Sequence, residues 1–227
     1  MTKIVCFSDT HGQHNSRKLN DWFADNPGDI LIFAGDFQRN HFDDGSDFVK
    51  WLVTLPYAHK VVAFGNHDGN GSMIKDELLG ISNVHILHNG SIIINGIKIF
   101  GSPNSLIFFN WYFMKTEEEL EEIYTNIPDD TNIVITHTPA FGIWDNTTRG
   151  IYAGSKSLLN RINELDQMKF HVCGHIHEGH GKGSFGNKIF INASLLNEKY
   201  QLVNMPYIFE YKRRKRKSSS NKSLDNI

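Results

Sequence analysis

The sequence is poor in cysteine and contains no long apolar run. Only two cysteines occur, Cys6 and Cys173, and each lies within a short apolar run typical of a buried strand. Two such residues give neither a disulfide framework nor zinc-finger spacing, so we expect buried free thiols and a reducing compartment. The longest apolar runs have four or five residues, such as 30–34, whereas a transmembrane helix needs roughly 18. We therefore expect no transmembrane segment, and the run after Met1 is too short for a secretory signal.

Charge is distributed unevenly along the chain. The 227 residues carry a formal net charge of -2, yet seven of the 23 lysines and arginines lie in 212–227 beside a single acid, Asp225. Residues 1–211 therefore have a net charge of -8, which argues against a broad nucleic-acid surface there. We expect one domain over 1–211 and a basic, disordered tail over 212–227, in a cytoplasmic protein. The tail is either a solvated end, a nuclear-localisation signal, or a weak contact for nucleic acid or an acidic surface.

Short strand-like runs alternate with stretches of helical periodicity. We expect strands at 3–7, 29–34, 60–64, 91–100, 132–136, 168–173, 187–192 and about 205–211. We expect helices at about 16–25, 44–54, 72–79, 116–125 and 154–165. This alternation predicts an α/β fold of layered β-sheets flanked by helices. Asn95-Gly96 between two apolar runs is typical of a β-hairpin, so the sheets should be mixed rather than purely parallel.

Polar side chains able to bind a metal follow five of the expected strands. They are Asp9 and His11 after the first strand, then Asp36, then Asn66, His67 and Asp68, then His137, and finally His175 and His177. The carboxyl ends of neighbouring strands in a layered α/β domain meet at one edge, where ligands usually bind. We therefore expect these side chains to converge at that edge.

Taken singly, each of these motifs has a structural explanation. Asp9 or Asn66 could cap a helix, Asp36 could close a Gly-Asp turn, and His137 could be a packed histidine at a strand end. However, glycine precedes three of the motifs, which allows a close approach of the backbone. The one-residue spacing within the first and last motifs also places both side chains on the same side of an extended segment. Recurrence at five strand ends favours a shared metal site.

In chain order, the motifs are Asp-x-His, Gly-Asp, Gly-Asn-His-Asp, a histidine after a strand, and Gly-His-x-His. This series resembles the signature of the calcineurin-like metallophosphoesterase superfamily, which implies a sandwich of mixed sheets between helices. Residues 174–181, 191–194 and 137–139 are similar to the branch that contains small cyclic-nucleotide phosphodiesterase-like enzymes. That branch commonly has His-Gly-Pro-Pro in place of residues 137–140, and Glu in place of Asp68. These differences leave the metal-binding positions unchanged and concern substrate preference.

The resemblance implies two divalent metal ions and a ligand set for each. One ion would be held by Asp9, His11, Asp36 and His177, and the other by Asp36, Asn66, His137 and His175. Asp36 would be the bridge, and the mixed oxygen and imidazole ligands suit manganese, iron, zinc or nickel, with manganese favoured. A hydroxide bridging the ions would attack phosphorus. His67 would stabilise the transition state or protonate the leaving oxygen, with Asp68 orienting its ring.

The resemblance favours hydrolysis of small phosphodiesters, with cyclic nucleotides as candidate substrates. The alternatives are a phosphomonoesterase or protein phosphatase, a nuclease, and a catalytically silent metal-binding scaffold. The nucleases of the superfamily usually carry a capping domain, for which residues 1–211 leave little room. A silent scaffold would be marked by loss of a ligand, and every motif position is present.

Two features admit more than one interpretation. The segment Leu106–Met114 carries five aromatic residues in nine positions. A buried segment or a contact between copies is favoured there over a base-stacking wall beside the metals. Glu178 and His180 either line the rim of the site or serve a local turn. The other histidines, among them His14 and His171, are expected to be solvated or packed.

Overall fold

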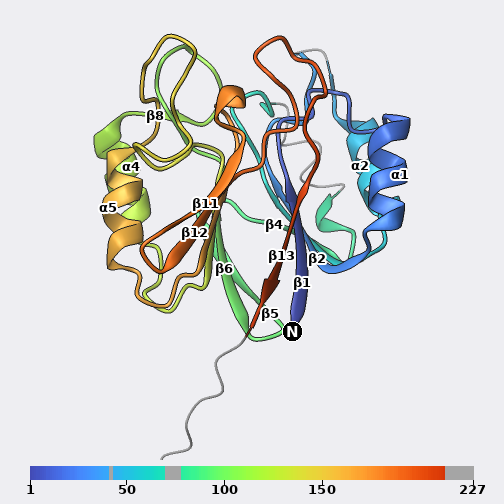
Figure 1. The fold of residues 1–227 in the computed structure, drawn as a ribbon, viewed down its shortest axis with the longest axis horizontal. Helices are drawn as coiled ribbons and strands as arrows, with labels where there is room; N and C mark the ends of the chain where they lie inside the picture. Colours follow the sequence, from blue (N-terminus) through green and yellow to red (C-terminus); the bar gives the residue numbers. More distant parts are fainter. Residues whose placement is uncertain (41–42, 70–77, 213–227) are drawn as a thin grey trace, which may run out of the picture.

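Two β-sheets face each other, and a pair of helices covers the outer face of each (Figure 1). The computed structural model of the chain describes residues 1–40, 43–69 and 78–212. The first sheet has the order β13 (Tyr207–Tyr211), β1 (Thr2–Phe7), β2 (Gly28–Ala34), β3 (Tyr57–Ala63) and β4 (Val84–Ile86). The second has the order β11 (Gly181–Phe185), β12 (Lys188–Asn192), β10 (Phe170–Cys173), β9 (Ile133–Thr136), β6 (Ile97–Ser102) and β5 (Gly90–Ile94). A separate short pair consists of β7 (Ser105–Leu106) and β8 (Met114–Lys115).

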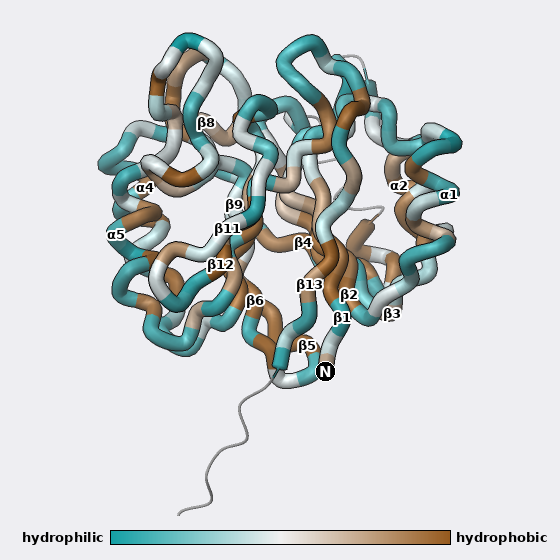
Figure 2. Tube along the Cα trace, in the orientation of Figure 1, coloured by the Kyte–Doolittle hydropathy of each residue, from teal (hydrophilic) through white to brown (hydrophobic). Residues whose placement is uncertain are grey.

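Alternating apolar residues in the strands create the layers. In β2, Ile30 and Ile32 face the core between the two sheets, whereas Leu31 and Phe33 face the helices. Apolar side chains on both faces explain why these strands appear in the sequence as continuous apolar runs. The strands form the hydrophobic centre of the molecule, and hydrophilic residues concentrate in the outer turns and helix surfaces (Figure 2). The result is three apolar cores, one between the sheets and one beneath each helix pair.

Within the described residues, four α-helices cover the sheets, and each buries only one face. They are α1 (Arg17–Asp25) and α2 (Ser46–Thr54) on the first sheet, and α4 (Glu117–Thr125) and α5 (Lys156–Glu164) on the second. Three of them begin at a side chain that accepts a backbone hydrogen bond, which satisfies amides that the helix itself leaves unpaired. Thr116 and Glu119 form a reciprocal capping box at the start of α4.

Parallel pairing brings the carboxyl ends of most strands to one edge of the sandwich. Strands β1 to β4 run parallel in the first sheet, and β6, β9, β10 and β12 run parallel in the second. The two sheets are joined at this edge, because Ser8 donates its amide to Ala193 O at 3.1 Å and accepts from Leu195 N at 3.1 Å. Strands from both sheets therefore deliver their following loops to the same place.

The structure confirms the layered α/β fold, the mixed sheets and the hairpin at Asn95-Gly96. Both cysteines are buried free thiols, as expected. The helix expected at 72–79 lies outside the described residues except for its last two positions, and the basic tail lies outside them except for Lys212. Strands β4, β7, β8 and β11 were not expected. Within the part of the chain that the structure describes, no helix is both long and apolar enough to cross a membrane.

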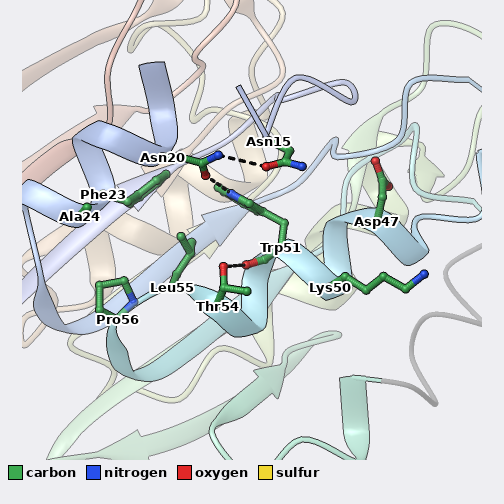
Figure 3. A pocket seen from close by; sticks show the side chains of 10 residues that line it. All are labelled: Asn15, Asn20, Phe23, Ala24, Asp47, Lys50, Trp51, Thr54, Leu55 and Pro56. Atoms are coloured by element: carbon green, nitrogen blue, oxygen red, sulfur yellow. Dashed lines mark hydrogen bonds between the residues drawn. The ribbon is translucent and has the colours of Figure 1, made fainter. Parts of the chain in front are cut away.

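A cavity of about 630 Å³ lies against α1 and α2, away from the edge where the strand ends meet. Its polar side chains bond to one another: Asn20 accepts from Trp51 Nε1 at 2.7 Å and donates to Asn15 Oδ1 at 3.0 Å (Figure 3). Asp47 and Lys50 at its border are surface residues of α2. The polar side chains Asn15, Asn20 and Trp51 of this cavity are thus hydrogen-bonded to one another, and none of the metal-binding motifs lines it.

His171 makes the fold sensitive to acid. It is 1% exposed on β10, and its Nε2 lies 2.8 Å from Thr136 Oγ1. Because the Thr136 hydroxyl donates to Thr138 O at 2.6 Å, His171 Nε2 is the donor in this pair. Burial lowers the pKa of His171 to about 3. The ring is thus neutral in the folded protein, whereas in the unfolded chain it gains a proton below about pH 6.5.

We predict that stability from His171 is present above pH 6.5 and is lost as the pH falls towards 3. Between these pH values, His171 should lower the free energy of unfolding by about 1.4 kcal/mol for each unit by which the pH falls. In His171→Gln, the free energy of unfolding measured by urea titration should therefore fall less steeply between pH 6.5 and 4.5. His59→Gln, at a half-exposed position on β3, controls for the loss of one histidine. Equal slopes in wild type and His171→Gln would contradict the prediction.

Candidate metal centre

The sequence-predicted side chains converge at the edge where the two sheets meet. Two clusters form there, and in each the candidate ligand atoms lie within 4.8 Å of one another. The first contains Asp9, His11 and His177, and the second contains Asp36, His137 and His175. These six residues follow β1 and β2 of the first sheet and β9 and β10 of the second, so the site requires both sheets.

In the first cluster, backbone carbonyls fix the orientation of the imidazoles. His11 Nδ1 lies 3.1 Å from Gln38 O, and His177 Nδ1 lies 3.0 Å from Asn197 O. A carbonyl only accepts, so Nδ1 carries a proton in both rings and Nε2 faces the cluster. His177 Nε2 lies 3.4 Å from Asp9 Oδ1, and this carboxylate raises the pKa of His177 against the effect of burial. His11 Nε2 is buried and has no hydrogen-bond partner. This arrangement, with one ring nitrogen donating to the protein and the other free, is typical of metal-binding histidines.

In the second cluster, a backbone carbonyl again orients a histidine, and its other ring nitrogen contacts Asp36 and Asn66. His137 Nδ1 lies 2.8 Å from Ala34 O, and His137 Nε2 lies 3.2 Å from Asp36 Oδ2 and 3.0 Å from Asn66 Oδ1. The same Asp36 oxygen lies 3.7 Å from His11 Nε2 in the first cluster. Asp36 Oδ2 therefore lies between imidazoles of the two clusters.

Burial and charge leave these groups in need of a cation. Burial lowers the pKa of His11 to about 4 and that of His175 to about 3, so both rings are neutral and keep a lone pair. Burial opposes ionisation of Asp36 as well, but the imidazole of His137 holds the pKa of its carboxyl well below the usual value, and Asp36 in turn raises the pKa of His137 to about 9. The buried carboxylate thus needs a positive charge beside it, and the mixed oxygen and nitrogen donors suit a divalent cation of the manganese, iron, zinc or nickel type in place of that proton.

Glycines allow the two clusters to approach each other. A Cβ on Gly35 would lie 2.6 Å from His137 Nδ1, and one on Gly65 would lie 2.7 Å from Asp36 N. A Cβ on Gly174 would collide with the Asp9 carboxylate. The close backbone approach expected from the sequence is thus confirmed at all three glycines.

The backbone of the site is strained. Asp9, His11, Asp36 and His175 have φ angles of 53°, 39°, 64° and 68°. Residues other than glycine rarely adopt this left-handed region, and each instance costs on the order of 1–3 kcal/mol. The turns after β1, β2 and β10 thus take an unfavourable conformation that aims their side chains into the site.

Asp68 holds the turn at Asp36 through backbone hydrogen bonds, and the role expected for it, orienting the His67 ring, stays a prediction. Its carboxylate accepts backbone hydrogen bonds from Gly65 at 2.7 Å, Asp36 at 2.8 Å, Phe37 at 2.9 Å and Gln38 at 3.2 Å. Burial and the nearby Asp36 charge raise the pKa of Asp68 above its usual value, and the backbone donors only partly oppose this rise. Asp68 is fully buried and is a positioning residue for the loop after β2.

His67 is held by other groups. Its amide donates to Asp36 Oδ1 at 2.8 Å, and its ring packs against His11 and Trp111, with centroid distances of 4.8 and 4.4 Å. It lines a cavity of about 410 Å³ that also contains Asp36, Asn66 and three of the cluster histidines. His67 is thus accessible to a ligand at the clusters, as expected.

The same cavity is lined by residues that the sequence analysis did not single out. Arg149, Glu198 and Tyr200 lie on loops after β9 and β12, and they follow no strand-end motif or periodicity that could have identified them. Glu178 does line the cavity, and it accepts from Thr148 N at 3.0 Å. His180 does not line it; its Nδ1 lies 2.8 Å from Ser194 O and its ring stacks on Tyr207.

Comparison with known proteins gives a consistent family. A model of the calcineurin-like phosphoesterase family matches residues 2–179. The chain is 33% identical over 223 residues to the UPF0046 protein K07C11.7 of Caenorhabditis elegans, covering 91% of this chain and 74% of the relative. It is 30% identical over 236 residues to the human metallophosphoesterase domain-containing protein 1, covering 92% of this chain and 71% of the relative.

Solved structures show the same fold. One aligns with a TM-score of 0.67 and 19% sequence identity over 84% of this chain and 90% of that chain. A phosphopantetheinyl hydrolase from Mycobacterium tuberculosis aligns with a TM-score of 0.55 and 13% identity over 87% of this chain and 90% of that chain.

We predict that Asp36→Asn and His175→Ala lose bound divalent metal. Asp36→Asn removes a charged carboxylate ligand, and His175→Ala removes an imidazole nitrogen. Asn66 and His137 remain in both variants. Affinity should fall by at least about 10- to 100-fold, the loss usual for removing only a supporting partner of a ligand. Metal content by elemental analysis and titration calorimetry measure it, with circular dichroism to show that the variants fold. His180→Ala, which removes a nearby imidazole outside the cavity, should keep the metal. Wild-type affinity in both cluster variants would contradict the assignment.

Proposed function

Because this chain belongs to the calcineurin-like phosphoesterase family, we propose that it hydrolyses small phosphodiesters, with cyclic nucleotides as candidate substrates. Family membership indicates metal-dependent hydrolysis of a phosphoester. The observation that carries the proposal is the position of Asp36 Oδ2 between His11 Nε2 and His137 Nε2, at the floor of a cavity large enough for a small ester.

The two clusters support the ligand sets that the family resemblance implies. One ion would be held by Asp9, His11, Asp36 and His177, and the other by Asp36, Asn66, His137 and His175. Manganese is our first candidate, followed by iron, zinc and nickel, since all of them accept mixed oxygen and imidazole ligands. Two such ions supply Lewis acidity, which lowers the pKa of water and neutralises charge on a phosphoryl group.

The residues of the chain position the reactants. Among the described residues that line the cavity there is no serine, threonine or cysteine. The nucleophile in this proposal is water activated by the metal ions, so no covalent intermediate with the protein is needed. His67 faces the cavity beside Asp36 and is the candidate acid that protonates the leaving oxygen. Asp68 keeps the Asp36 turn in place by its backbone hydrogen bonds.

Arg149 gives the cavity affinity for an anion. It is the only lysine or arginine among the described lining residues, and it forms no ion pair with a described residue. Its loop is closed by hydrogen bonds from Gly150 N to Thr147 O at 2.8 Å and from Thr147 N to Ile151 O at 2.9 Å. These bonds fix the backbone that carries Arg149, and a guanidinium at this position suits the oxygens of a phosphoryl group. We further propose a cytoplasmic location, which fits the two buried free thiols.

We predict that diesters are better substrates than monoesters. The test measures kcat/KM with manganese for aryl diesters, aryl monoesters, 2′,3′- and 3′,5′-cyclic nucleotides and single-stranded DNA. A chelator should abolish turnover, and added metal should restore it. A monoester with a higher kcat/KM than every diester would indicate a phosphatase, and a preference for DNA would indicate a nuclease. No turnover of any ester by metal-loaded protein would leave the scaffold alternative.

We predict that His67→Ala lowers kcat by roughly 10²–10⁴, the usual contribution of a positioned acid. Metal content should stay close to that of wild type. The loss should be larger for an alkyl diester than for a p-nitrophenyl diester, because a good leaving group needs less protonation. Equal losses for both esters would instead assign His67 to stabilisation of charge on phosphorus.

A further inference from the structure

Three aromatic rings gather at the mouth of the cavity. Phe108, Phe109 and Trp111 lie between β7 and β8, and their ring centroids are 4.9, 5.1 and 5.5 Å apart. Phe108 is 51% exposed and Phe109 is 61% exposed. The interpretation of Leu106–Met114 as a buried segment is therefore wrong for this part of it.

Two of these rings adjoin the proposed catalytic groups. Phe108 and Trp111 line the cavity; Phe108 lies 5.6 Å from the His175 ring and Trp111 lies 4.4 Å from the His67 ring. A substrate whose phosphoryl group lies at the two clusters would place its ester groups against these aromatic faces.

The loop that carries the rings is firmly attached. Its ends pair through β7 and β8, where Ser105 N donates to Phe113 O at 3.1 Å and Ile107 N donates to Lys115 O at 2.9 Å. Near its C-terminal end the loop is bound to the site, because Tyr112 N donates to Asn66 O at 3.3 Å. The rings are thus held at the cavity by the fold, and an aromatic surface kept exposed beside a polar site is typical of a binding surface.

We propose that Phe108 and Trp111 form a subsite for a planar aromatic group, such as a nucleobase, attached to the phosphoester. Aromatic faces bind any base without reading its hydrogen-bonding edge. The lining residues Glu178 and Glu198 supply acceptors for the edge of a heterocycle. The inference rests on the proposed function and specifies the class of substrate for that site.

The test compares two esters that differ only in the base. One is adenosine 2′,3′-cyclic phosphate and the other is the cyclic phosphate of 1-O-methylribose, so the leaving oxygen is the same. Wild type should prefer the first in kcat/KM by about 5- to 100-fold, the range expected for one stacked base. Phe108→Leu and Trp111→Leu should bring this ratio of kcat/KM values towards one. Phe108→Tyr, which keeps an aromatic ring, should retain the wild-type ratio. Phe185→Leu, at an exposed phenylalanine of β11 outside the cavity, should keep the wild-type ratio.

A binding measurement separates this inference from the proposed function. Calorimetry with manganese-loaded protein should show tighter binding of adenosine monophosphate than of ribose 5-phosphate, and Phe108→Leu should remove the difference. This result would support the subsite even if the diester activity failed. Equal binding of both ligands by wild type would overturn it. Concentration-dependent dimerisation that is lost in Phe108→Leu, with no base preference, would assign the rings to a contact between copies and also overturn it.

Discussion

The site depends on one constraint: a buried carboxylate, Asp36, must lie between imidazoles that come from different sheets. Isolated burial of this charge would be costly, so it persists only with close partners. Histidines 11 and 137 provide them, and each is fixed by a backbone carbonyl on its other nitrogen. Glycines 35 and 65 make room for this approach, and the Asp68 carboxylate gathers four amides to hold the turn. The second buried acid, Asp68, thus binds the backbone of the two turns that surround Asp36.

The sandwich supplies the stability that this arrangement uses. Four site residues have left-handed backbone angles, which together cost several kcal/mol at about 1–3 kcal/mol each. Three apolar cores, one between the sheets and one under each helix pair, offset that cost. The joint between the sheets at Ser8, Ala193 and Leu195 lies beside the strained turns and prevents the two clusters from separating. A strained backbone conformation persists only where the contacts around it fix that conformation.

Much of this could be predicted from the sequence, for identifiable physical reasons. Strands buried on both faces appear as continuous apolar runs, and metal-binding side chains directly after them mark the functional edge. The sequence does not predict which of the five strands belong to which sheet, because the residues of a strand do not show which other strand it pairs with. Strand β11, with two glycines in five residues, lacks the composition of a strand and forms only by pairing with β12. The role of Asp68 was also hidden, since its four partners are backbone amides that any residue could supply.

The aromatic segment shows a different limit of sequence reasoning. A run rich in phenylalanine and tryptophan predicts removal from water but does not say whether the chain or a ligand removes it. Here the loop between β7 and β8 is fixed at both ends and still leaves Phe108 exposed beside the clusters. The metal-competent residues follow directly from strands of the rigid scaffold, whereas Phe108, Arg149, Glu198 and Tyr200 lie on longer loops. Loops vary more readily than strands among relatives. In the proposed function, the metal chemistry therefore belongs to the strand ends and the choice of substrate to the loops, so the substrate is to be found by experiments on this chain.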